Sequence, residues 1–181
     1  MKKIIAILIT MIISFTMSVS AFAQSVTYEA MGVPNINSSF KTWMDYKLCA
    51  KGSAQRNFSD TWGWMDSEGF MRCSGEKELG INDDYYLVAL GSYYGRTIGT
   101  KYKITTDTGN IFYVVLAEYK DNSETNSTNQ YATANNNIIE FLIHPTYLNY
   151  QVKFIGSANV LAPLNGSIIK IEKMHFNYTS N

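Results

Sequence analysis

The sequence predicts a mainly β protein, and three observations support this prediction. Residues 85–90 form a nearly continuous apolar run, residues 101–105 alternate polar and apolar side chains, and turn-forming residues separate these from later segments. Such runs, bounded by Gly, Asn and Asp, are typical of β-strands. Hydrophobic residues make up 46% of the 181 residues and charged residues 17%, so the composition is that of a packed globular chain rather than a disordered one.

Residues 1–23 have the pattern of a secretory signal peptide. Lys2 and Lys3 precede an apolar run over residues 4–19, and residues 21–23, Ala-Phe-Ala, form a small-x-small cleavage site. We therefore expect an exported bacterial protein, secreted or associated with the cell wall, with no membrane segment after cleavage. A transmembrane anchor is the alternative, but the run contains Ser and Thr, and no charged stop-transfer cluster follows it.

Residues 24–84 lack a regular strand pattern and are expected to pack on the strands that follow. Phe40, Trp43, Met44 and Leu48 have helical spacing, which predicts a short helix over residues 40–48.

An aromatic hairpin is expected after this helix. Trp62 and Trp64 precede residues 66–69, Asp-Ser-Glu-Gly, a turn in which the Gly suits a positive φ. Flat indole faces match the C–H face of a sugar ring, so we predict that both tryptophans bind substrate. Ordinary core packing is the alternative.

Cys49 and Cys73 are the only cysteines of the chain. In an exported protein we expect them to form one disulfide, and two buried free thiols are the alternative. No CxxC motif is present, and His144 and His175 lie far from both cysteines in the sequence, so we expect no metal site. Phosphate-binding Gly-rich motifs are also missing, and we expect no cofactor.

Residues 85–174 are expected to form one β domain, followed by a tail over residues 175–181. Residues 107–110, Asp-Thr-Gly-Asn, predict a hairpin turn, and the polar residues 121–137 predict a long exposed loop. The predicted strands cover residues 85–90, 101–105, 111–119, 138–144, 151–155 and 166–174.

Part of this region resembles a known family. Residues 87–90, Leu-Val-Ala-Leu, and residues 98–104, Ile-Gly-Thr-Lys-Tyr-Lys-Ile, resemble the opening of double-psi β-barrel domains of the three-aspartate type. That group includes the catalytic domain of lytic transglycosylase A and the muralytic domains of Gram-positive spore and stationary-phase factors. The resemblance covers residues 85–174 and implies a closed six-stranded double-psi barrel.

The resemblance also implies a catalytic site for cleaving peptidoglycan. Glu118 ends the segment that matches the family's Ala-Asp strand, and Glu140 matches the aspartate that opens a later strand. The first family aspartate is replaced near Gly91, so the acidic triad is incomplete here. The whole chain is also similar to uncharacterised secreted proteins of Gram-positive anaerobes that carry the segment over residues 40–46, and this second resemblance implies no activity.

The position of Glu118 in its strand also supports a catalytic role, without the family resemblance. It follows Phe112, Val114 and Leu116 at a period of two, so we expect its carboxyl to end an inward-pointing row. A carboxyl held there can act as general acid on a glycosidic bond. A solvated carboxylate, or one paired with Lys101, Lys103 or Lys120, is the alternative.

Glu140 shares a predicted strand face with Leu142 and His144, because the three follow one another at a period of two. We therefore expect Glu140 to be a second catalytic carboxylate and His144 to contact the same substrate. A structural role at the strand end is the alternative for His144.

Two function classes remain open at this point. One is an exported enzyme that cleaves cell-wall glycan, and the other is a non-catalytic module that binds cell-wall glycan or another polysaccharide. The chain has 15 Lys and Arg residues against 15 Asp and Glu residues, so it lacks the basic field that binds nucleic acid. We expect a monomer whose partner is a polysaccharide.

Overall fold

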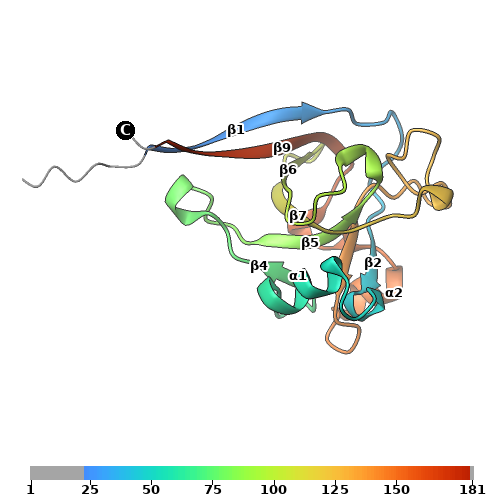
Figure 1. Ribbon diagram of the computed structural model, residues 1–181. Coiled ribbons are helices and arrows are strands. Elements are labelled where there is room, and N and C mark those ends of the chain that lie inside the picture. The colour runs from blue at the N-terminus through green and yellow to red at the C-terminus, as the bar shows by residue number, and fades with distance from the viewer. Residues whose placement is uncertain (1–22, 180–181) are drawn as a thin grey trace, which may run out of the picture.

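The computed structural model describes residues 23–179, and it confirms the mainly β prediction (Figure 1). The predicted signal peptide, apart from Ala23, lies outside the described residues. Between residues 23 and 179 no helix is long and apolar enough to cross a membrane. The strands and α-helices are β1 (Ala23–Met31), β2 (Thr42–Asp45), α1 (Ala54–Trp62), β3 (Trp64–Met65), β4 (Met71–Cys73), β5 (Tyr85–Leu90), β6 (Lys101–Thr106), β7 (Ile111–Tyr119), β8 (Glu140–Ile143), α2 (Tyr150–Ile155) and β9 (Ile168–Thr179).

Strand β5 lies at the centre of one mixed sheet. It pairs with β7 in parallel and with β4 and β8 in antiparallel orientation, and the path β1-β9-β6-β7-β5-β4-β3 connects most of the strands. Strand β2 pairs in parallel with the other side of β8. The closed barrel that we expected is not formed, because no backbone pairing joins β2 to β9 in the described part of the chain.

Side chains from residues 38–41 bridge the opening between β2 and β9. The Ser38 hydroxyl accepts a hydrogen bond from the Ile168 N–H at 2.9 Å and donates to the Ile168 carbonyl at 3.1 Å. The fully buried Lys41 ammonium donates to the carbonyls of Ser39 and Gly166 and to Oδ1 of Asn159. Side-chain hydrogen bonds thus satisfy backbone N–H and C=O groups that would pair with each other if β2 and β9 were neighbouring strands of a closed barrel.

Lys41 is expected to make the stability of the fold depend on pH. Burial lowers the pKa of Lys41 to about 8, against the opposing charge of Asp107. Above pH 8 the unfolded chain keeps this proton while the folded chain releases it, so the contribution of Lys41 to stability rises with pH up to its unfolded pKa. Between pH 8 and 9 we expect the free energy of unfolding of the wild type to rise by about 1 kcal/mol relative to Lys41→Met. Urea unfolding of reduced protein at both pH values measures this difference, and parallel pH profiles would contradict it.

The sheet buries both of its faces under separate core clusters. Side chains of β5 alternate between them: Val88 and Leu90 belong to the large core cluster, and Leu87 and Ala89 to the small core cluster. The large core cluster also contains Phe70, Phe112 and Phe141, whose rings contact the partly buried Tyr86 ring edge to face. Burial on both faces explains why residues 85–90 are apolar without strict alternation.

Three local predictions are wrong. Residues 40–48 form no helix but contain β2 and the 3-10 turn η1 (Tyr46–Leu48), because Trp43 and Met44 pack on opposite faces of the sheet. Residues 151–155 belong to α2, which Asn149 caps by accepting from two backbone N–H groups. Residues 175–179, expected in a tail, belong to β9 and pair with β1. Figure 1 shows β1 and β9 as a ribbon that extends beyond the other strands.

The predicted hairpins are confirmed. β3 and β4 pair around the turn at residues 66–69, where Gly69 has φ +86° and Asp66 Oδ1 accepts from the N–H groups of Glu68 and Phe70. β6 and β7 pair around Gly109, at φ +84°. At both turns the glycine takes the left-handed conformation that other residues adopt at a cost.

Candidate functional site

Glu118 and Glu140 lie on either side of Ala89. In the sheet, Ala89 of β5 pairs with Glu118 of β7 on one side and with Glu140 of β8 on the other, and Thr42 of β2 continues this row beyond Glu140. Neighbouring strands lie about 4.8 Å apart, so the two glutamate Cα atoms are about 10 Å apart. The small side chain of Ala89 leaves space between the two carboxyl groups.

A β-bulge places Glu118 in this row. Val88 pairs with Leu116, but the next pair is Ala89 with Glu118, so Ala117 is an extra residue in β7. Glu118 therefore leaves the face of Leu116 and joins the face of Ala89, above the small core cluster. The expectation that it continues the row of Phe112, Val114 and Leu116 is wrong, because the bulge shifts the alternation by one residue.

A pocket of about 910 Å³ opens over the two glutamates. Its floor includes Ala89, and one wall comes from the loop over residues 121–137, which the sequence predicted as an exposed loop. Hydroxyl and amide side chains are frequent around it. The lining residues are Thr42, Trp43, Met44, Leu48, Ala89, Glu118, Tyr119, Lys120, Asp121, Glu124, Ala132, Thr133, Ala134, Asn135, Asn137, Glu140 and Gly156.

Lys120 holds the Glu140 carboxylate. The Lys120 ammonium lies 3.3 Å from Glu140 Oε2, and the lysine side chain is only 4% exposed. Burial lowers the pKa of Lys120, and the charge and hydrogen bond of Glu140 oppose that shift. A buried ammonium needs such a partner, so this ion pair fixes the position of Glu140 at the pocket edge.

Glu118 has a different environment. Its Oε1 accepts a hydrogen bond from the backbone N–H of Tyr119 at 2.9 Å, and no ion pair involves Glu118 within residues 23–179. The Cys49 thiol lies against its carboxylate. Burial, followed by the hydrogen bond and charge of Glu118, raises the pKa of Cys49 to about 12. Cys49 is thus a protonated neighbour of Glu118 at neutral pH.

The predicted disulfide is not formed. Cys49 and Cys73 are both free, buried thiols in the small core cluster. Both thiols are buried without a covalent partner, as free cysteine packs like a small hydrophobic residue, and charged side chains lie beside each of them.

The other predicted site residues lie away from the glutamate pocket. Trp62, at the end of α1, lines a second pocket of about 440 Å³ that shares no residue with the first. Trp64 is 43% exposed on β3 and lines neither of these two pockets. The structure therefore brings Glu118 and Glu140 together but not Trp62, Trp64 or His144.

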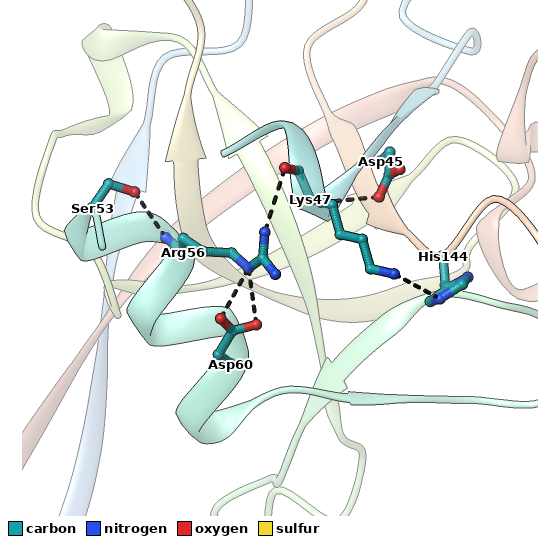
Figure 2. Close-up of polar contacts among 6 residues, drawn as sticks. All are labelled: Asp45, Lys47, Ser53, Arg56, Asp60 and His144. Carbon is teal, nitrogen blue, oxygen red and sulfur yellow. Dashed lines mark hydrogen bonds and ion pairs between the residues drawn. The ribbon is translucent and has the colours of Figure 1, made fainter. Parts of the chain in front are cut away.

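His144 belongs to a polar cluster beside η1 and α1 (Figure 2). Its Nε2 lies 3.4 Å from the Lys47 ammonium, and its ring packs against Tyr147 with 4.9 Å between centroids. Figure 2 also shows Arg56 paired with Asp60 one turn along α1, whose first turn is capped by Ser53. Arg56 also donates a hydrogen bond to the Lys47 carbonyl at 3.4 Å, which links α1 to η1. His144 does not line the glutamate pocket.

Sequence reasoning missed two neighbours of the glutamates, Thr42 and Cys49, and it named Lys120 as one of three lysines available to pair with a carboxylate. Lys120 starts a polar loop, where a lysine is normally solvated, so nothing in the sequence marks it as buried. Thr42 and Cys49 come from a segment far from the glutamates in the sequence, and only the pairing of β2 with β8 brings that segment to the site.

Among residues 23–179, no group of three or more His, Cys, Asp or Glu side chains is arranged to hold a metal ion. Comparison with protein-family models, with curated proteins and with solved structures gives no significant match to this chain.

Proposed function

We propose that this protein is an exported enzyme that cleaves the glycan strands of the bacterial cell wall by acid/base catalysis in the glutamate pocket. The observation that carries the proposal is the placement of Glu118 and Glu140 on either side of Ala89 in one pocket. Cleavage of a glycosidic bond needs an acid for the departing oxygen and a negative charge near the oxocarbenium-like transition state. Two carboxyl groups on one pocket can supply both.

The different environments of the two glutamates assign their roles. Glu140 is paired with the Lys120 ammonium and serves as the ionised carboxylate that stabilises positive charge on the sugar ring. Glu118 is free of ion pairs among the described residues, so no cation holds it in the ionised form, and we assign it the role of proton donor.

The reaction follows the lytic transglycosylase pattern. Glu118 donates its proton to the glycosidic oxygen as the bond from that oxygen to C1 breaks. The 6-hydroxyl oxygen of the same muramyl residue then bonds to C1, and its proton returns to the Glu118 carboxylate, which restores the enzyme and gives a 1,6-anhydro product. Water at C1 would give the hydrolytic product instead.

The family resemblance supports the same proposal. Strands β2, β8, β5, β7, β6 and β9 follow one another around the large core cluster, and Ser38 and Lys41 bridge the remaining opening. We take this set of six strands as the counterpart of the double-psi barrel. The two glutamates stand at the positions that two of the family's aspartates occupy.

A non-catalytic glycan-binding module is the second candidate function. The observation that favours it is Trp62, which is 66% exposed and lines a pocket away from both glutamates. Exposed tryptophans beside a pocket are frequent in binding sites that take sugar rings.

Incubation of the purified protein with peptidoglycan sacculi separates these functions. The enzyme releases soluble muropeptides, and mass spectrometry distinguishes anhydro products from hydrolysed ones by the mass of one water molecule. A binding module sediments with the sacculi and releases nothing. Absence of soluble products over a range of pH would overturn the proposed cleavage.

A further inference from the structure

The second pocket is a built cavity with a mixed lining. Its volume of about 440 Å³ lies within the usual range of small-molecule sites. Side chains from α1 form one wall and residues 73–76 with the start of β6 form the other. The lining residues are Phe58, Trp62, Cys73, Ser74, Gly75, Glu76, Gly99 and Lys101.

One side of this pocket is aromatic. Trp62 is 66% exposed although it stands on the folded helix α1, so a large indole surface is left uncovered. The Phe58 ring lies beside Gly99, where a Cβ would be only 3.4 Å from the ring, and Gly99 has φ +91°. The positive φ favours glycine at this position.

The other side is polar and fixed in place. Lys101 and Glu76 form an ion pair in which the two side chains are 21% and 29% exposed. The Lys101 ammonium also lies over the rings of Tyr85 and Phe176, at 4.8 and 5.1 Å from their centroids. The Lys101 ammonium can therefore donate a hydrogen bond to a ligand, and the neighbouring Glu76 carboxylate can accept one.

Cys73 does not make this pocket a reactive site. Burial raises the pKa of the Cys73 thiol to about 11, against the opposing charge of Lys101. The thiol is therefore protonated at neutral pH, so the pocket holds no thiolate nucleophile there.

We propose that the Trp62 pocket is a separate binding site for a small saccharide. An indole face packs on the apolar C–H face of a sugar ring, while the Lys101 and Glu76 pair donates to and accepts from its hydroxyl groups. A purely apolar ligand would leave that ion pair desolvated, and a highly charged ligand would gain nothing from the exposed indole. The assignment rests on the lining of this pocket alone and does not require turnover at Glu118.

The test uses a soluble trisaccharide of β-1,4-linked N-acetylglucosamine as the probe. Calorimetric titration is expected to show that Trp62→Ala weakens binding by about 10-fold or more. Trp64→Ala is the matched control, because Trp64 is exposed nearby but does not line the pocket, and we expect it to bind as the wild type does. Backbone amide signals of Gly75 and Gly99 are expected to shift on binding.

Three results would overturn this proposal: no binding by the wild type at millimolar probe, equal binding by wild type and Trp62→Ala, or an equal loss in Trp64→Ala. The thermal midpoint of each variant shows whether it is folded, and Lys101→Met provides a second variant on the polar side. The same titration in Glu118→Gln separates this site from catalysis. Trp62-dependent binding without product release would support the saccharide site and overturn the proposed cleavage. Product release without Trp62-dependent binding would support cleavage and overturn the saccharide site.

Discussion

Glu118→Gln is expected to lower the release of soluble muropeptides by about 100-fold or more while binding to sacculi is retained. Glutamine preserves the shape of the side chain and accepts the hydrogen bond from the Tyr119 N–H, but it has no acidic proton to give to the departing oxygen. The measurement is the initial rate of product release by wild type and variant at equal amounts of bound protein.

Glu78→Gln is the control for this substitution. Glu78 is an exposed residue of the 3-10 turn η2 (Lys77–Leu79), outside both pockets, so the same chemical change there is expected to leave the rate unaltered. Full activity in Glu118→Gln would refute the role of this residue, even with the enzyme class established.

Phe141→Ala is expected to destabilise the fold by about 3–5 kcal/mol. Phe141 is fully buried on β8, and its ring lies 5.3 Å from the rings of both Phe70 and Tyr86, centroid to centroid. Removing it leaves a cavity in the large core cluster that rigid neighbours cannot fill. A loss of this size is a large part of the stability of an ordinary domain, which is about 5–15 kcal/mol.

Urea unfolding measures this loss, and Phe154→Ala is its matched control. Phe154 is 74% exposed on α2, so the same truncation there is expected to change the free energy of unfolding by less than about 0.5 kcal/mol. Phe141→Leu, which fills most of the space, is expected to cost less than Phe141→Ala. Equal midpoints for Phe141→Ala and Phe154→Ala would contradict the assignment of Phe141 to the core.

Much of the β structure could be predicted from the sequence because its local signals agree with the tertiary fold. Residues 85–90 and 111–119 form β5 and β7 with the predicted bounds, and the glycines at positions 69 and 109 mark real turns. The helix predicted over residues 40–48 is wrong because a strand that is buried on both faces of the sheet has neighbouring apolar residues, which can also match helical spacing. Trp43 and Met44 have helical spacing with their neighbours, but each packs into a different cluster across a strand.

The candidate site was found in part, although one step of the reasoning was incorrect. Period-two counting placed Glu118 on the face of Leu116, and the bulge at Ala117 placed it beside Ala89 instead. No sequence pattern marks a bulge at an Ala. The partners of the glutamates come from distant segments, as the Lys120 and Cys49 contacts show, and such long-range contacts leave no local signal.

The pairing of β1 with β9 also determines when the growing chain is most prone to aggregate. Ala23 lies opposite Thr179, so β1 has no strand partner until β9 has been synthesised. Bringing together ends so far apart costs conformational entropy and slows folding. During this interval β1 is an unpaired strand whose single charge, Glu29, does little to deter pairing with other chains. Aggregation in the cell is therefore expected to begin with β1, before β9 has been made.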